Sequence, residues 1–189
     1  MMAHSMEIER RFFIDGRSQK PWRDGFKTSS IKQYYLDYDQ FIILGHDLIY
    51  DSINLVRLND EEIEIISSSD NLTSRIRMVD QRAILTMKAN VSRASAIELE
   101  WEIKTNHADR VIDLKSFPYV EKTRYFWSGL DDLVWEVDEF EGGLAGLILA
   151  EVELSDENQE VELPEWLGME LTGLSNWSNA ALAKTLSND

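Results

Sequence analysis

The sequence predicts an α+β fold in which antiparallel strands form a barrel or a strongly curved sheet beside a few helices. Two observations support this prediction. Runs of 5 to 8 residues alternate between apolar and polar side chains along most of the chain, which is the pattern of strands with two different faces. By contrast, only two segments have the spacing of an amphipathic helix. The 189 residues suffice for one core, so we expect residues 1–189 to form a single domain.

The predicted strands are short segments in which successive side chains alternate in polarity and β-branched or aromatic residues are frequent. A glycine-rich run at 141–147 separates the last two of them. No helical pattern follows this run, so it predicts a hairpin turn rather than a phosphate-binding loop. The nine predicted strands are residues 8–14, 30–36, 62–67, 74–79, 83–88, 97–104, 120–127, 133–140 and 147–154.

The two predicted helices are residues 108–117 and 176–186. In both, apolar residues recur three or four positions apart and therefore share a face. Ser175 or Asn176 would be the N-cap of the second helix. The segment 37–72 is less regular, because apolar patches alternate with acidic ones. We interpret it as an insertion within the domain that forms an extra hairpin or a mobile lid.

Composition limits the classes of function. The net charge of −16 argues against binding to nucleic acid or to an anionic membrane, both of which need a basic surface. The chain has no cysteine, which excludes disulfides, thiolate metal ligands and a cysteine nucleophile. No apolar run is long enough for a membrane span or a signal core. We therefore expect a cytoplasmic protein, either a monomer or a homodimer.

Charged side chains repeatedly share one face of a predicted strand. In the first strand, alternation places Glu7, Glu9 and Arg11 on one side and Ile8 and Phe12 on the other. One such strand alone usually turns its charges to water. Here several faces are almost purely ionic, and they are divided into acidic and basic strands. The same alternation groups Arg75 with Arg77, Thr86 with Lys88, Glu98 with Glu100 and Glu102, Lys122 with Arg124, Glu136 with Asp138, and Glu151 with Glu153.

Closing these strands into a barrel leaves two arrangements open. The apolar faces could fill the interior, or the ionic faces could line a tunnel while helices cover the outside. Trp101, Phe126, Trp135 and Phe140 would then need that cover. An ionic tunnel is costly to desolvate unless its charges pair or bind ligands. Clustered carboxylates bind Mg²⁺ or Mn²⁺, and arginine and lysine bind phosphate oxygens, so such a tunnel would suit phosphoryl transfer.

The ordered motifs resemble the CYTH domain, also called the triphosphate tunnel metalloenzyme family. They are EIERR, IKQYYL, SRIR, ILTMK, ELEWEI, EKTRY, WEVDEFEGGLAGLILAEVEL and LPEWLGMELT, and the resemblance runs from Glu7 to about Leu182. It implies an eight-stranded antiparallel barrel closed as a tunnel with flanking helices. Members of this family hydrolyse inorganic triphosphate or thiamine triphosphate, or convert ATP to cyclic AMP, with Mg²⁺ or Mn²⁺.

The resemblance also implies roles for individual residues. Glu7 and Glu9 match the first acidic pair of metal ligands, and together with Arg11 they would be catalytic. Glu170 matches a carboxylate at the end of the tunnel. The remaining metal or supporting carboxylates would be Glu151, Glu153, Glu100, Glu102 and Asp138, and the substrate-binding cations would be Arg11, Arg75, Arg77, Lys88, Lys122 and Arg124.

The sequence departs from the family pattern at two site positions. Arg11 stands where the family has a lysine, and arginine does not deprotonate usefully, so a lysine-base role would be lost while charge stabilisation remains. Ala96 stands where the family has an arginine, which removes one phosphate contact unless Arg93 or Arg82 substitutes.

We expect metal-dependent hydrolysis of a linear triphosphate, with inorganic tripolyphosphate as the first candidate. A class IV-like adenylyl cyclase or a thiamine triphosphatase is the alternative within the family. The substitutions at Arg11 and Ala96 keep a third possibility open, a non-catalytic protein that binds nucleotide or polyphosphate.

Overall fold

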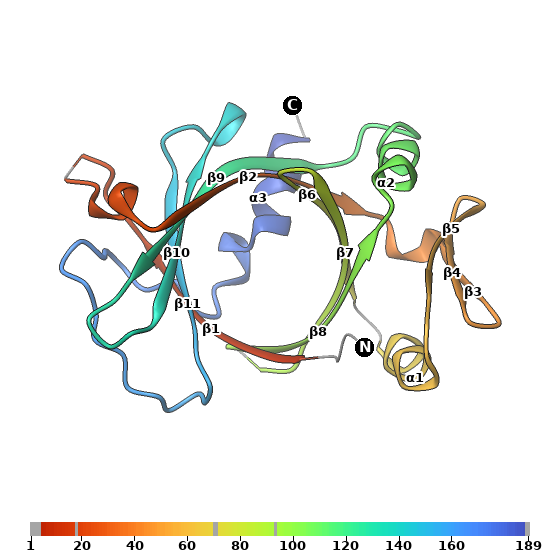
Figure 1. Cartoon of the computed structure of the whole chain (residues 1–189), viewed down its shortest axis with the longest axis horizontal. Helices are drawn as coiled ribbons and strands as arrows, with labels where there is room; N and C mark the ends of the chain where they lie inside the picture. Colours follow the sequence, from red (N-terminus) through yellow and green to blue (C-terminus); the bar gives the residue numbers. More distant parts are fainter. Residues whose placement is uncertain (1–4, 18, 70–71, 93, 188–189) are drawn as a thin grey trace.

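The main body of the molecule is a closed barrel of antiparallel strands (Figure 1). The computed structural model describes residues 5–17, 19–69, 72–92 and 94–187. Around the barrel the strand order is β1-β11-β10-β9-β2-β6-β7-β8, and β8 pairs with β1 to close the ring. This confirms the predicted eight-stranded α+β barrel. The strands are β1 (Ser5–Phe13), β2 (Lys27–Leu36), β6 (Thr73–Val79), β7 (Arg82–Asn90), β8 (Ser95–Ile103), β9 (Tyr119–Ser128), β10 (Val134–Phe140) and β11 (Ile148–Glu153).

A small sheet lies beside the barrel, on the right in Figure 1. It consists of β3 (Phe41–Leu44), β4 (Asp47–Tyr50) and β5 (Ile53–Arg57), and helix α1 (Asp60–Ser68) follows it. Its buried face packs with α1 and the outer faces of β7 and β8 in one apolar cluster. The extra hairpin expected in segment 37–72 is therefore present. None of its described residues lines the tunnel cavities, and its role as an insertion or lid stays a prediction.

The prediction of a strand at 62–67 is wrong, because these residues belong to α1. Asn59 caps the helix: its side chain accepts a hydrogen bond from the Glu62 backbone, and the Glu62 side chain accepts one from the Asn59 backbone. This reciprocal pair satisfies two backbone donors and starts a helix at that point. Glu62 is also buried, where its carboxylate accepts a hydrogen bond from Trp101 Nε1 at 3.0 Å.

The other helices differ from their predicted bounds by a few residues. Helix α2 (Thr105–Ile112) begins earlier than predicted and ends five residues before Phe117, which is buried beyond it. Helix α3 (Asn179–Leu186) is capped by Ser178. Among the described residues, no helix combines the length and apolar character needed to cross a bilayer. The short 3-10 helices are η1 (Pro21–Asp24), η2 (Tyr38–Gln40), η3 (Gly142–Leu144) in the predicted hairpin turn, and η4 (Ser175–Trp177) just before α3.

The barrel turns its ionic faces inward, which settles the choice left open by the sequence. Trp101 and Trp135 are buried in apolar clusters outside the lumen, as expected. Phe126 and Phe140 were expected there too, but that was wrong. They stand directly opposite Glu136 and Lys122 in the register, and directly opposed residues share a face of the sheet.

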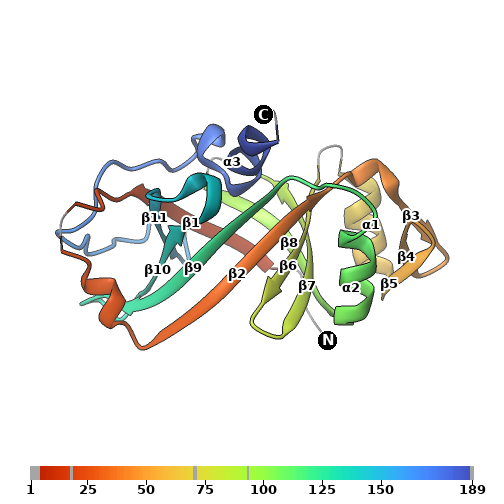
Figure 2. The ribbon, with the colours of Figure 1, turned by 90° about the horizontal axis from the view of Figure 1, so that it is seen from above.

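Helix α3 lies against one end of the barrel (Figures 1 and 2). There the inner faces of β2, β10 and β11 carry apolar residues, and Tyr35, Phe140 and Leu149 pack with Leu182 and Ala183 of the helix. This contact explains how Phe140 is buried although it points inward. The two ends of the barrel are therefore different, and we call this one the α3 end.

Candidate active site

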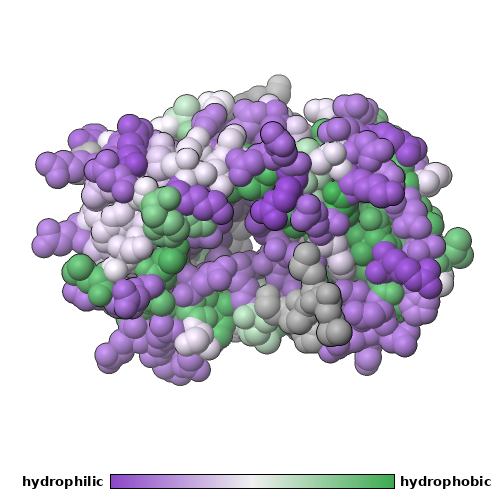
Figure 3. All heavy atoms as spheres, in the orientation of Figure 1, coloured by the Kyte–Doolittle hydropathy of each residue, from purple (hydrophilic) through white to green (hydrophobic). Residues whose placement is uncertain are grey.

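The centre of the barrel is a narrow chamber of about 120 Å³ with an almost entirely ionic wall. Figure 3 shows a hollow among hydrophilic residues near the middle of the molecule. We call this space the central chamber. Every barrel strand that was predicted to have an ionic face contributes to it. The residues that line it are Glu7, Glu9, Arg11, Ile31, Gln33, Arg75, Arg77, Lys88, Glu98, Glu100, Lys122, Arg124, Glu136, Glu151, Glu153 and Asn179.

A larger cavity of about 520 Å³ continues from the central chamber toward the α3 end. We call it the α3-end cavity. The two spaces share Glu9, Arg11, Arg75, Lys88 and Asn179 in their walls, so they form one continuous tunnel. Val91, Ser92 and Ala94 of the β7–β8 connection line one side of this cavity, and residues 172–175 and 178–180 line another.

Four carboxylates on three adjacent strands crowd one side of the central chamber. The register sets Glu9 opposite Glu153, and Glu151 opposite Glu136. Burial, together with the charge of Glu151, raises the pKa of Glu9 to about 7. Burial and the charge of Glu136 likewise raise the pKa of Glu153. The ionised form of these two carboxylates is therefore disfavoured. Carboxylate oxygens are the ligands that Mg²⁺ and Mn²⁺ prefer, so residues of this type suit a divalent ion.

Lys122 and Arg124 on β9 form a basic group of the chamber. Asp138 on β10 contacts both of them. Lys122 Nζ lies 2.5 Å from Asp138 Oδ2, and Arg124 Nε lies 2.6 Å from Asp138 Oδ1. The side chains of Lys122 and Asp138 are only 2% and 1% exposed. Burial lowers the pKa of Lys122, although Asp138 opposes this shift. Asp138 does not belong to the chamber wall, so the structure places it as a support for two cations.

Arg11 joins the acidic group to the α3 end. Its Nε lies 2.7 Å from Glu151 Oε1, its Nη2 lies 2.7 Å from Glu9 Oε1, and its Nη1 donates to the Trp177 carbonyl at 3.3 Å. Burial alone would lower the pKa of Arg11, but the charges of Glu151 and Glu9 hold it above its ordinary value. Arg11 therefore keeps its proton and orients two carboxylates.

Glu151 shows how strong the positive surroundings are at this point. Burial would raise the pKa of Glu151, but the charges of Arg11 and Arg124 outweigh it and hold the pKa below its ordinary value. Arg124 Nη2 lies 3.2 Å from Glu151 Oε2, on the side of the carboxylate away from the Arg11 contact. Glu151 is thus ionised and held between two guanidinium groups.

A second basic group lies across the tunnel on β6 and β7. Arg75 Nη2 donates to Glu98 Oε1 at 2.9 Å, and Arg77 Nη2 lies 3.8 Å from Glu100 Oε1. Lys88 contacts the carboxylate of Glu7. The cations predicted to bind substrate therefore all face the tunnel, and in this conformation each one lies near a carboxylate.

The structure brings together most, but not all, of the predicted metal ligands. The central chamber is lined by Glu7, Glu9, Glu100, Glu151 and Glu153, whereas Asp138 is not part of its wall. Across the described ranges, no group of three or more His, Asp or Glu side chains is arranged to hold a metal ion in this conformation. The lumen carboxylates instead contact the cations described above, apart from Glu153, which makes no ion pair with another described residue.

Two predicted residues lie away from the chamber. Glu102 shares the inner face of β8 with Glu100 but lies farther along the barrel, where it is half-exposed 3.7 Å from Arg82. Glu170 lies on the outer surface and forms two hydrogen bonds with Arg10, at 2.9 and 2.8 Å. The expectation that Glu170 is a carboxylate at the tunnel end is therefore wrong, because its partner is on the outward face of β1.

Ala96 lines the α3-end cavity, as expected for a position that would carry a phosphate contact in the family. Of the two arginines considered as substitutes, Arg82 lies outside both tunnel cavities. Arg93 lies outside the described residues.

Four polar residues of the central chamber wall, and the apolar Ile31, were missing from the predicted site. Glu98 and Glu136 belong to ionic strand faces that alternation had already identified, so this signal could have included them. Gln33 faces the chamber from β2, where apolar and aromatic neighbours hide the pattern. Asn179 comes from α3, and no strand pattern could reveal a helix that reaches into the lumen.

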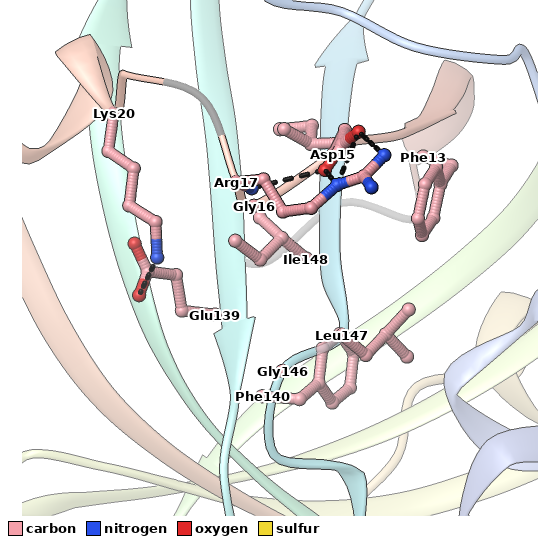
Figure 4. A pocket seen from close by; sticks show the side chains of 11 residues that line it. Phe13, Asp15, Gly16, Arg17, Lys20, Glu139, Phe140, Gly146, Leu147 and Ile148 are labelled. Atoms are coloured by element: carbon pink, nitrogen blue, oxygen red, sulfur yellow. Dashed lines mark hydrogen bonds and ion pairs between the residues drawn. The ribbon is translucent and has the colours of Figure 1, made fainter.

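A further cavity of about 490 Å³ lies outside the lumen, between the residues that follow β1 and the β10–β11 connection (Figure 4). Its charged side chains pair with one another. Arg17 contacts Asp15, and Lys20 lies 3.9 Å from Glu139. With Arg17 and Lys20 as its cations, this cavity lacks the convergent set of arginines and lysines that lines the central chamber.

The fold and the site together define a class of protein, an eight-stranded antiparallel barrel closed around an ionic tunnel. No family model matches the chain. It is 38% identical over 111 residues to the inorganic triphosphatase of Acetivibrio thermocellus, covering 58% of this chain and 70% of that protein. It is 30% identical over 124 residues to the inorganic triphosphatase of Nitrosomonas europaea, covering 65% and 82%. The chain belongs to the CYTH family of triphosphate tunnel metalloenzymes.

A solved structure has the same fold along nearly the whole chain. The crystal structure of the inorganic triphosphatase NE1496 aligns with a TM-score of 0.56 and 24% identity, covering 97% of this chain and 95% of that one. The similarity therefore includes the barrel strands and the C-terminal region that contains α3.

Proposed function

We propose that the protein hydrolyses a linear triphosphate, with inorganic tripolyphosphate as its substrate and Mg²⁺ or Mn²⁺ as its cofactor. The observation that supports this most strongly is the chamber itself. Strand register collects Glu9, Glu151 and Glu153 on one side and aims buried cations at them from the neighbouring strands. Two relatives named inorganic triphosphatase, each matched over at least two thirds of its length, support the same activity.

The ion pairs of the chamber suggest how ligands bind. In the present conformation, carboxylates and cations neutralise each other across the lumen. A polyphosphate that takes the arginines and lysines leaves the carboxylates unpaired and buried, which is costly. A divalent ion that takes the carboxylates leaves the cations unpaired in the same way. We therefore expect polyphosphate and metal to bind together, each satisfying the groups that the other releases.

The residues divide the work of hydrolysis. Arg75, Arg77 and Lys88 would hold the phosphates from one side of the tunnel, with Lys122 and Arg124 on the other. Glu9, Glu151 and Glu153 would hold the divalent ion, which would supply neutralisation of the phosphate charge. Water then attacks a terminal phosphorus, the bridging P–O bond breaks, and the products are orthophosphate and pyrophosphate.

Product analysis tests this proposal against the alternatives. The full chain is incubated with tripolyphosphate, ATP or thiamine triphosphate in Mg²⁺ or Mn²⁺, and orthophosphate, pyrophosphate and cyclic AMP are measured. Orthophosphate and pyrophosphate from tripolyphosphate are expected. Cyclic AMP from ATP would indicate a cyclase instead, and preferential cleavage of thiamine triphosphate would indicate a thiamine triphosphatase. Binding of all three without turnover would indicate a non-catalytic binder.

A variant pair links the activity to the chamber. Replacing both carboxylates of β11, Glu151→Gln with Glu153→Gln, should abolish metal-dependent phosphate release. The matched control is Glu170→Gln, which neutralises a carboxylate outside the lumen. Full activity in the double variant would overturn the proposed site.

Two predictions about context stay open to direct measurement. The proposed cytoplasmic location is supported by the composition and is measured by cell fractionation. The oligomeric state, monomer or homodimer, is measured by light scattering.

A further inference from the structure

Asn179, the first residue of α3, is a buried amide without a partner in the wall of the tunnel. It lines both the central chamber and the α3-end cavity. The residue is 8% exposed, and its Oδ1 makes no hydrogen bond with another described residue. Buried polar groups are almost always satisfied, so this oxygen without a partner in a cavity wall indicates a missing ligand. Rotating the amide by half a turn exchanges Oδ1 with the NH₂ group, so the side chain can offer the cavity either an acceptor or two donors.

The first turn of α3 offers further donors at the same place. The first four N–H groups of a helix have no partner within it. Ser178 Oγ accepts from the Ala181 N–H, which leaves the N–H groups of Asn179 and Ala180 without a partner inside the helix. Ala180 also lines the α3-end cavity. A helix N-terminus carries partial positive charge and favours anions, so these groups suit a phosphate.

Cations face this turn from the barrel. Arg11, Arg75 and Lys88 line the same cavity, and Arg75 Nε is buried without a partner. Arg11 also donates to the Trp177 carbonyl, which ties the chain just before α3 to the tunnel wall. The carboxylate of Glu9 lies in this wall too, already engaged by Arg11. Unpaired donors therefore approach one space from both the helix and the strands.

We propose that Asn179 and the first turn of α3 form the subsite for the phosphate group at the α3 end of the bound triphosphate. This inference rests on the proposed function, because it assigns one end of the same substrate. Asn179 would donate its amide N–H to a phosphate oxygen, while Arg75 supplies the charge from across the cavity. The amide has an acceptor oxygen as well, so coordination of the divalent ion by Oδ1 is the rival role.

Three substitutions separate these roles. Asn179→Ala removes the amide, Asn179→Ser keeps a small polar group at the start of the helix, and Asn179→Asp replaces the donor with a negative charge. Asn176→Ala is the matched control, because Asn176 is exposed in η4 three residues away. The kcat and KM for tripolyphosphate and the Mg²⁺ concentration for half-maximal rate are measured for each full-length variant, with melting temperatures to confirm folding.

The expected result is a KM effect. Asn179→Ala should raise KM by about 10- to 100-fold, the scale for losing a hydrogen bond to a charged group, while kcat stays within about 3-fold. Asn179→Asp should raise KM further, and the control should leave it unchanged. Asn179→Ser keeps a hydroxyl donor and should raise KM less than Asn179→Ala does. An unaltered KM in Asn179→Ala would overturn the subsite. An Asn179→Asp variant that needs less Mg²⁺ would overturn it in favour of metal coordination.

A binding measurement keeps this test independent of turnover. Calorimetric titration of inorganic tripolyphosphate into wild type and Asn179→Ala gives the loss of affinity directly. If the wild type binds tripolyphosphate without hydrolysing it, the proposed activity fails, yet a weaker affinity in the variant still supports the subsite. Equal affinities would reject the subsite even if the wild type is fully active.

Discussion

Strand β1 carries an arginine on each face, and the two have opposite surroundings. Arg10 points outward and pairs with Glu170 on the surface, whereas Arg11 points inward between Glu9 and Glu151. Outside, hydrogen bonds from Arg10 lower the pKa of Glu170, and those from Arg23 lower the pKa of Glu139. Inside, burial raises the pKa of most lumen carboxylates, namely Glu7, Glu9, Glu136 and Glu153.

The opposite pKa shifts of the two sets of carboxylates arise from their different hydration and from the neighbouring carboxylates, not from residue type. An outer carboxylate gains a partner and keeps most of its hydration, so its ionised form is favoured. Most inner carboxylates lose hydration and lie near other carboxylates, so their ionised form is disfavoured even beside a cation, whereas Glu151 stays ionised between two guanidinium groups. We therefore expect the ion pairs of the outer surface to persist, whereas the charged groups of the lumen should exchange their partners for bound metal and polyphosphate.

Breaking an inner support should have the largest effect. Asp138→Ala leaves the buried Lys122 and Arg124 without their shared partner, and we expect a loss of about 3–5 kcal/mol in unfolding free energy. Urea denaturation measures it. The outer counterpart, Glu170→Ala, should cost no more than about 1 kcal/mol. Equal losses in the two variants would contradict the contrast between the faces.

Metal removal should affect the lumen next most strongly. Because each ligand satisfies the groups that the other releases, EDTA should weaken tripolyphosphate binding by at least about 10-fold, equivalent to about 1.4 kcal/mol. Calorimetry with and without Mg²⁺ measures the coupling, and the reciprocal titration of Mg²⁺ with and without tripolyphosphate must give the same factor. Independent binding of the two would argue against exchange of partners.

The two faces should also respond to pH with opposite signs in the metal-free protein. Glu9 has a folded pKa of about 7, above its ordinary 4.5, so its contribution to stability is present at low pH and is lost as pH rises from about 4.5 to 7. Glu139 has a lowered folded pKa, so its contribution is present above 4.5 and is lost as pH falls.

Melting temperatures between pH 3 and 8 test these signs. Glu9→Gln should reduce the loss of stability between pH 5 and 7, and Glu139→Gln should reduce the loss below pH 4.5. A Glu9→Gln variant with the wild-type profile between pH 5 and 7 would show that this carboxyl ionises normally.

Arg11→Lys tests whether residue 11 acts by charge alone. The wild type should show no alkaline limb in kcat from this residue, since the pKa of Arg11 lies above its ordinary value. The lysine variant keeps the charge but loses one of the two carboxylate contacts, so we expect kcat to fall about 3- to 10-fold. A gain in rate with a new pH-dependent limb would instead favour a base at this position.

The smallest effect is expected for the outer face. Glu170→Gln should change the unfolding free energy by less than about 1 kcal/mol and leave kcat and KM for tripolyphosphate unchanged. A drop in activity would mean that the outer surface of β1 influences the lumen after all.

Much of the barrel and its lumen was predictable from alternation, because a strand has only two faces and the barrel has only one inside. Errors arose where another rule applied. At 62–67 the reciprocal cap between Asn59 and Glu62 produced a helix from a segment with strand character. Glu102 has the right face, but alternation does not show how far along the barrel a residue lies. Phe140 shares a strand face with Glu136, so alternation itself places it inside, and α3 explains how an inward phenylalanine is buried there.

The position of Asn179 in the tunnel wall could not be predicted from the sequence for a different reason. Its place depends on a helix from the end of the chain folding back onto the lumen, which is a tertiary contact without local periodicity. Arg11 was recognised as unusual, but its links to Glu9, Glu151 and Trp177 required coordinates.

Closure of the barrel has a consequence for how such a chain can diverge. Every strand of the ring has a neighbour on both sides, so no lumen residue can change without altering the surroundings of residues on two other strands. We therefore expect substitutions in the lumen to occur in pairs. A reversed charge on one strand should be tolerated only after a complementary change on the neighbouring strand. The residues of the tunnel wall should therefore evolve together, although they come from segments spread over most of the chain.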